Sequence, residues 1–157
     1  MVNGSEQRCS HQQANKFKME CPLCVICRDE LVWEDEYCRV LASSDPDYPG
    51  YFRVVWGEHV AEMSDLEGCA RRHFMEVVFA VESSLRALMN PDKINLASLG
   101  NKVPHLHWHV IARFVDDRHF PESIWGCEQR LAPQRDALEN SVLATQIAIE
   151  LARISIT

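Results

Sequence analysis

The sequence has no apolar stretch that approaches the roughly 18 residues of a membrane-spanning helix, so we expect no membrane partner. Residues 1–18 are polar and lack the apolar centre of a secretory signal, which predicts a flexible N-terminal arm and a cytoplasmic protein. Clustered Lys and Arg are also missing, and the formal charge of the 157 residues is −7. This balance argues against a nucleic-acid polymer as the main partner, although a small nucleotide needs only a local pocket.

Two other signatures are absent. No Gly-x-Ser-x-Gly motif is present, which weakens a serine-hydrolase interpretation. The seven cysteines are an odd number, and without a signal peptide they do not indicate a disulfide framework. The cysteines that we expect to be free thiols are Cys9, Cys38, Cys69 and Cys127.

Hydrophobic residues make up 46% of the chain, which predicts one folded domain with a core. Short runs rich in β-branched and aromatic residues, separated by turn formers, predict strands. The four runs that precede residue 100 are Leu31–Trp33, Tyr37–Ala42, Tyr51–Trp56 and Ile94–Leu99. The first two flank a short polar segment and are interpreted as a hairpin.

Two helices are predicted. Ser64 and Glu67 form a capping-box pattern ahead of a long helix that ends at Asn90-Pro91, because proline cannot continue a helix. Pro133 suits the first turn of a C-terminal helix that reaches about residue 154. The apolar stripe expected on this second helix consists of Leu138, Val142 and Ile149. Strands with short connections and one central helix indicate an α+β fold.

Three imidazoles are the main functional signal. His105, His107 and His109 recur at every second position of the apolar run 103–114, which is interpreted as a fifth strand. Side chains alternate between the faces of a strand, so the three rings point one way and lie roughly 6.6 Å apart. An imidazole has a pKa of about 6.5, so it serves near neutrality as a nucleophile or as a proton donor. Such a cluster suits phosphoryl or nucleotidyl transfer.

The pattern resembles the histidine-triad (HIT) family, whose signature His-φ-His-φ-His-φ-φ, with φ apolar, is complete at residues 105–111. Residues 21–24 read Cys-Pro-Leu-Cys, as in bacterial zinc-containing members similar to diadenosine tetraphosphate hydrolases. The resemblance implies a HIT-like domain at residues 19–126, with a five-stranded antiparallel sheet and a long central helix. Residues 127–157 would form a C-terminal helical extension, packed on the domain or on the partner in a homodimer.

The resemblance also implies a reaction. His107 would attack the α-phosphorus of a nucleotide and form a covalent nucleotidyl-histidine, while His109 would bind the phosphate and the leaving group. The implied substrates are dinucleoside polyphosphates, such as diadenosine tetraphosphate, or nucleoside phosphoramidates. One alternative is a nucleotide-binding module without catalysis. Another is a catalytic metal held by all three triad histidines, for which no matching carboxylate stands out.

Further site residues come from the same resemblance. Asn95 and Asn101 match polar positions near the substrate, and Lys102 stands where many relatives carry Ser or Thr. A ribose-binding carboxylate would come from Asp45 or Asp47, between which the spacing does not choose.

A structural zinc site is also implied by the resemblance. The ligands that it implies are Cys21, Cys24, His59 and His105. Two thiolates and two imidazoles form a sensible tetrahedral zinc set. Cys27 offers a competing pair with Cys24, so the metal is better supported than the ligand assignment.

Overall fold

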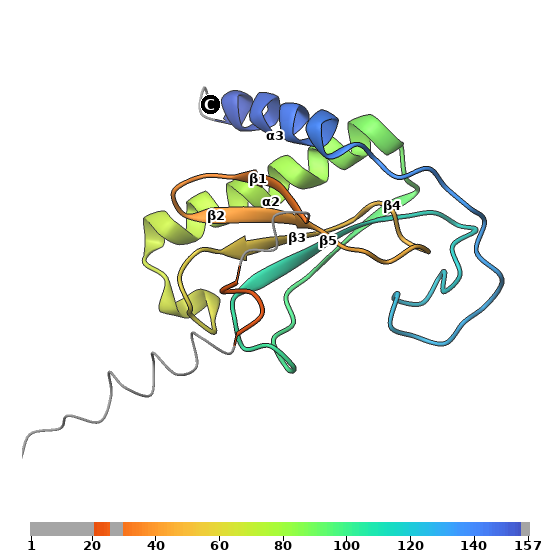
Figure 1. The fold of residues 1–157 in the computed structure, drawn as a ribbon, viewed down its shortest axis with the longest axis horizontal. Helices are drawn as coiled ribbons and strands as arrows, with labels where there is room; N and C mark the ends of the chain where they lie inside the picture. Colours follow the sequence, from red (N-terminus) through yellow and green to blue (C-terminus); the bar gives the residue numbers. More distant parts are fainter. Residues whose placement is uncertain (1–20, 26–29, 155–157) are drawn as a thin grey trace, which may run out of the picture.

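The computed structural model describes residues 21–25 and 30–154 (Figure 1). A five-stranded antiparallel sheet has the strand order β1-β2-β3-β5-β4. The strands are β1 (Leu31–Glu34), β2 (Cys38–Ala42), β3 (Tyr51–Trp56), β4 (Lys93–Ala97) and β5 (His107–Arg113). The predicted α+β class and the five-stranded sheet are confirmed. The N-terminal arm and Cys27 lie outside the described residues.

Both long helices pack on the same face of the sheet (Figure 1). Alternation along the strands turns one set of side chains toward them, including Val54 on β3 and Val110 on β5, both fully buried. The other set, including Arg53 and His109, faces away from the helices, and these two residues are paired across the strands. The core therefore occupies one side of the sheet and leaves the opposite side for a polar site.

The central helix α2 (Gly68–Met89) buries a stripe of apolar side chains that includes Phe74, Val77 and Val81. Its end agrees with the prediction, because Asn90 takes the left-handed conformation just before Pro91. The predicted start is wrong.

The N-cap of α2 is Glu67, and the predicted cap Ser64 lies within a short 3-10 helix, η1 (Met63–Asp65). The backbone N–H of Glu62 donates to the Asp65 carboxylate at 3.1 Å, so a cap of this kind forms one turn earlier.

The C-terminal helix α3 (Asn140–Ile154) begins later than Pro133 predicts, since residues 131–139 have no regular secondary structure. Its buried residues are Leu143 and Ile147, whereas Val142 and Ile149 are 46% and 43% exposed. Of the predicted stripe, Leu138 precedes the helix and packs against the core, whereas Val142 and Ile149 lie on a different side of α3 from its buried residues. The helix packs against α2 and β1.

The strand predicted at residues 103–114 begins later than expected, because β5 spans His107–Arg113. The sheet ladder of β5 begins at His107, and His105 precedes it with its backbone N–H bonded to the carbonyl oxygen of Val103 at 2.8 Å. His105 is fully buried, whereas His107 and His109 are each 7% exposed.

Among residues 21–25 and 30–154, no helix combines the length and the apolar character needed to cross a bilayer.

Candidate functional site

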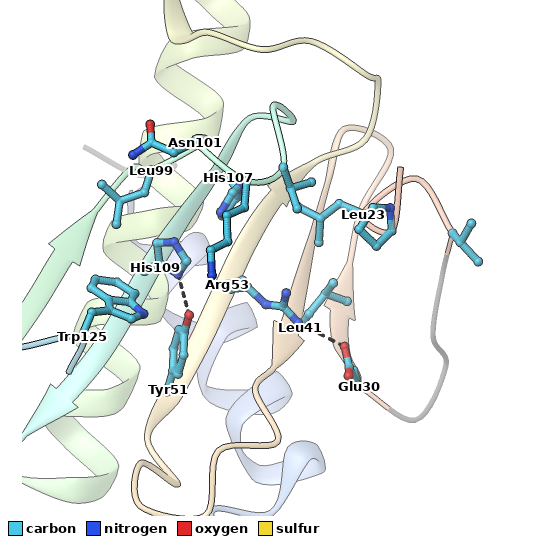
Figure 2. Close-up of a pocket in the computed structure, with 14 residues that line it drawn as sticks. Leu23, Glu30, Leu41, Tyr51, Arg53, Leu99, Asn101, His107, His109 and Trp125 are labelled. Carbon is cyan, nitrogen blue, oxygen red and sulfur yellow. Dashed lines mark hydrogen bonds and ion pairs between the residues drawn. The ribbon is translucent and has the colours of Figure 1, made fainter. Parts of the chain in front are cut away.

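A cavity of about 710 Å³ lies on the face of the sheet opposite the helices, and His107 and His109 line it. Figure 2 shows both rings on β5 beside side chains from β3 and the neighbouring loops. The ring centroids of His107 and His109 are 4.8 Å apart and the rings lie nearly perpendicular. Two imidazoles therefore share one cavity, close enough to act on one bound group.

The orientation of His107 is fixed by the backbone carbonyl of His105. Its Nδ1 lies 2.6 Å from the carbonyl oxygen of His105. A carbonyl oxygen only accepts hydrogen bonds, so Nδ1 carries the proton and donates it. Neutral His107 thus keeps its lone pair on Nε2. Burial lowers the pKa of His107, and this effect outweighs the carbonyl of His105, which raises it. The ring is therefore neutral near pH 7, and its Nε2 lone pair is chemically able to act as a nucleophile.

His109 has different neighbours. Its Nδ1 shares a 2.8 Å hydrogen bond with the Tyr51 hydroxyl, and Trp125 packs edge-on at a centroid distance of 5.1 Å. Burial, followed by the charges of His107 and Arg53, lowers the pKa of His109 to about 4. When the Tyr51 hydroxyl donates to Nδ1, neutral His109 carries its proton on Nε2. The ring can then donate a hydrogen bond to a phosphoryl oxygen or a leaving group.

The predicted substrate-binding residues fall in two places. Asn101 and Lys102 line the cavity with the two imidazoles. Asn95 does not line it, because its Oδ1 accepts a 2.7 Å hydrogen bond from Arg113 on the neighbouring strand. Asp45 and Asp47 do not line the cavity either.

Several cavity-lining residues were not anticipated from the sequence. Tyr51 and Arg53 project from β3 beside the imidazoles, and Glu30 pairs with Arg53 at 3.2 Å (Figure 2). The alternation of Tyr51 and Arg53 with buried apolar residues on β3 is a signal that indicates their shared face. Trp125 lies in a loop with no comparable pattern.

The four predicted metal ligands come together beside the start of β5. Their potential ligand atoms, on Cys21, Cys24, His59 and His105, lie within 4.8 Å of one another. Nδ1 of His105 lies 3.5 Å from both Sγ atoms, and Nδ1 of His59 lies 3.3 Å from Sγ of Cys24. None of the described cysteines forms a disulfide.

These distances fit a tetrahedral metal. With zinc–sulfur and zinc–nitrogen bonds of about 2.3 and 2.0 Å, sulfur and nitrogen ligands lie about 3.5 Å apart. His105 is also in the required tautomer, because its Nε2 donates to the carbonyl oxygen of Trp56 at 2.7 Å and leaves the Nδ1 lone pair toward the thiols. The cluster therefore fits zinc. His107 and His109 are not part of it, so the three histidines do not form one metal site among the described residues.

A second group, Asp35, Cys38 and His73, also gathers potential ligand atoms. Here both oxygens of the Asp35 carboxylate already have partners within the protein. Asp35 Oδ1 accepts the backbone N–H groups of Tyr37 and Cys38 at 2.8 and 2.7 Å, and Oδ2 contacts His73 Nε2 at 2.7 Å. Burial, followed by the Asp35 carboxylate, raises the pKa of the Cys38 thiol far above its usual range. Hydrogen bonds thus occupy the carboxylate oxygens of Asp35, and the arrangement needs no metal to explain it.

Comparison with known proteins agrees with this geometry. A family model described as the HIT domain matches residues 27–116, so the chain belongs to the HIT family. A histidine triad protein of Bradyrhizobium japonicum is 30% identical, with a TM-score of 0.59, and the match covers 78% of this chain and 87% of that one. A search of curated proteins gives no match.

Two more distant structures share the fold. A histidine triad nucleotide-binding protein of Sulfolobus tokodaii is 16% identical, with a TM-score of 0.57 and coverage of 86% of this chain and 94% of that one. A zinc-bound histidine triad family protein of Mycobacterium smegmatis is 19% identical, with a TM-score of 0.56 and coverage of 88% and 98%. At these identities the likeness establishes the fold alone.

Proposed function

We propose that the protein is a nucleotide hydrolase or transferase that acts on the α-phosphate of a nucleotide through a covalent nucleotidyl-histidine at His107. One observation carries this proposal: the 2.6 Å hydrogen bond from Nδ1 to the His105 carbonyl oxygen, which leaves the Nε2 lone pair of a cavity-lining ring unprotonated. The candidate substrates are dinucleoside polyphosphates, such as diadenosine tetraphosphate, and nucleoside phosphoramidates, as in the hydrolase-like subgroup of the family.

The first step forms a bond between His107 Nε2 and the α-phosphorus while the bond from phosphorus to the leaving group breaks. The leaving group departs with the bonding electron pair and takes a proton from water, while neutral His109 donates a hydrogen bond to it through Nε2. Asn101 and Lys102 line the same cavity and supply a donor and a positive charge for the phosphate oxygens. Splitting one displacement into two easier steps is the physical benefit of the covalent route.

The second step returns the enzyme to its starting state. Water attacks the phosphorus, the bond to Nε2 breaks, and the nucleoside monophosphate leaves with the oxygen of that water. The proton lost by the attacking water passes to the solvent, which balances the proton taken up by the leaving group in the first step. Burial lowers the pKa of both imidazoles, so His107 is neutral when it attacks in the first step and His109 is neutral near pH 7.

We also infer a structural zinc ion. The residues that would hold it are Cys21, Cys24, His59 and His105. The Zn-bound Mycobacterium smegmatis relative supports the inference. With all four positions filled by protein, the metal would connect the loop at Cys21 and Cys24 to the start of β5 and would supply no open coordination site for catalysis. We further expect a homodimer, by family resemblance.

The proposal is tested by incubating the protein with diadenosine tetraphosphate and with an adenosine phosphoramidate while AMP is measured. His107→Ala should lower turnover by about 10⁴-fold or more, since removal of a nucleophile eliminates the covalent route. Thermal unfolding and zinc content of the variant should match the wild type. Wild-type rates in His107→Ala would refute the covalent role. Tight binding without turnover in the wild-type protein would favour a nucleotide-binding module instead.

A further inference from the structure

Arg53 brings a positive charge onto the face of the sheet that carries the imidazoles. It lies directly across from His109 in the pairing of β3 with β5, and side chains at such positions share one face. Figure 2 shows its side chain beside the imidazoles, extending toward Glu30 and Leu41. Burial is the main cause of the lowered pKa values of His107 and His109, and the charge of Arg53 lowers both further. Arg53 is therefore within electrostatic reach of a group that the imidazoles bind.

Most of the guanidinium has no partner in the described part of the chain. Its Nη2 donates to Glu30 Oε2 at 3.2 Å, and no other hydrogen bond of the guanidinium is found among residues 21–25 and 30–154. Nε is buried and lacks an acceptor within the same residues. A guanidinium carries several N–H donors in a planar fork, of which this contact uses a single one. A buried donor without an acceptor costs free energy, and a ligand that supplies the acceptor removes this cost.

The contact between Arg53 and Glu30 is a weak ion pair. Charged hydrogen bonds to a carboxylate are commonly about 2.7–2.9 Å long. The bond from Arg118 to Asp47 is 2.7 Å long, whereas the contact with Glu30 measures 3.2 Å. The side chains of Arg53 and Glu30 are 26% and 34% exposed, and an ion pair of this kind contributes little stability. The guanidinium can therefore exchange this carboxylate for a better anion at small cost.

The surroundings of Arg53 favour an anionic ligand. Among the described residues that line the cavity, Arg53 and Lys102 are positively charged and Glu30 is the single carboxylate, whereas the formal charge of the whole chain is −7. Leu41, the partner of Arg53 on β2, is 5% exposed and belongs to one apolar cluster with Leu23. An apolar wall reduces screening by water, so a phosphate is attracted more strongly there than in solvent. The cavity is thus locally positive in an acidic protein.

We propose that Arg53 binds phosphate oxygens of the nucleotide and that Glu30 is its counter-ion when no nucleotide is bound, so that the phosphate displaces the carboxylate. This inference rests on the proposed function only in that the cavity binds a nucleotide. The planar fork of a guanidinium matches two phosphate oxygens at once. The phosphate of a nucleoside monophosphate carries a charge of about −1.5 to −2 near pH 7, which exceeds that of a carboxylate. Glu30 then opposes binding, because it competes with the phosphate for the same donors.

Calorimetry with a nucleoside 5′-monophosphate and its own nucleoside provides the test without requiring turnover. The monophosphate that binds most tightly is used, and the two ligands differ only in the phosphate. Arg53→Gln should weaken the monophosphate by about 10- to 100-fold and leave the Kd of the nucleoside within about twofold. Arg53→Lys keeps the charge without the fork and should lie between Arg53→Gln and the wild type. Arg72→Gln removes the same charge from an exposed position on α2 and should match the wild type.

Glu30→Gln should change the affinity in the opposite direction. It should tighten the monophosphate by about 3- to 5-fold, because the competing charge is removed. The same change in the Arg53→Gln background should alter the Kd by less than about twofold, since Glu30 then has no guanidinium to release. Glu34→Gln, an exposed change on β1, is the matched control and should leave the Kd as in the wild type.

The inference is overturned if Arg53→Gln binds the monophosphate as tightly as the wild type, if it weakens both ligands equally, or if the wild type binds both ligands alike. It is also overturned if Glu30→Gln leaves the monophosphate unchanged or weakens it. Normal AMP release together with unchanged monophosphate affinity in Arg53→Gln refutes this inference alone. Phosphate affinity that depends on Arg53, in a wild-type protein without turnover, refutes only the proposed catalysis.

Discussion

His105 and His107 differ in which ring nitrogen is bonded to the backbone. His105 donates through Nε2 to the carbonyl oxygen of Trp56, so its Nδ1 faces the thiols of Cys21 and Cys24. His107 donates through Nδ1 to the carbonyl oxygen of His105, so its Nε2 is left for the cavity. Two neutral imidazoles only two positions apart are therefore held in opposite tautomers.

This difference assigns different tasks to one motif. The carbonyl that each ring contacts decides where its lone pair points, and the direction of the lone pair decides whether the ring serves a metal or a phosphorus. The metal cluster and the cavity thus lie side by side while using separate atoms. Mutations should therefore separate the two regions. The first two changes below each act on one region and spare the other, and the third, Asp35→Asn, acts on neither.

Cys24→Ser should have the largest effect on stability. Loss of a thiolate ligand should reduce bound zinc from about one equivalent to near zero. The free energy of unfolding should fall by about 4 kcal/mol, the stabilisation expected when free zinc exceeds its Kd a thousandfold. Elemental analysis and denaturant unfolding are the measurements, and Cys69→Ser at an exposed cysteine is the control. Unchanged zinc in Cys24→Ser would reject the cluster as the metal site.

Acid should destabilise the cavity through His109. Its pKa is about 4 in the folded protein and about 6.5 when unfolded, so the unfolded chain binds more protons between these values. Stability that is present above pH 6.5 should decline as the pH falls toward 4, by up to about 3 kcal/mol from this group. Urea unfolding from pH 7 to 4 should show a shallower decline in His109→Gln. Parallel curves for the two proteins would exclude His109 as the source of the acid sensitivity.

Asp35→Asn should have the smallest effect of the three. The isosteric amide keeps an oxygen that accepts from the backbone N–H groups of Tyr37 and Cys38. It loses the negative charge and the second oxygen, Oδ2, which contacts Nε2 of His73. Unfolding measurements should show a loss of about 1–2 kcal/mol. Zinc content should not change. A loss of one zinc equivalent in Asp35→Asn would mean that Asp35, Cys38 and His73 form a second metal site. The cluster that contains Cys24 would then not be distinguished from this group by its zinc.

The strands of the sheet were predictable because their signals are local. Alternating apolar residues located β1, β2 and β3, and Asn90-Pro91 marked the end of α2. The face of α3 could not be predicted in the same way. Apolar residues occur on more than one side of this helix, so both stripes fit a helical period. Contact with α2 and β1 selects Leu143 and Ile147 for burial.

The candidate site was predictable to a similar extent. The spacing of the triad placed His107 and His109 on one face, and the resemblance brought four distant metal ligands into one prediction, which the structure gathers within 4.8 Å. Glu30 and Trp125 escaped prediction because neither belongs to a local pattern. Their place beside the imidazoles depends on how β1 and the loop after β5 fold across the sheet.

The most direct test of the covalent mechanism is to trap the nucleotide on His107. Wild-type protein would be mixed with a diadenosine polyphosphate, denatured at alkaline pH within milliseconds, digested and analysed by mass spectrometry. We expect one nucleoside monophosphoryl group on the peptide that contains residues 105–113, located at His107 and absent from His107→Ala. Continued release of AMP with no adduct at any time point would contradict the mechanism.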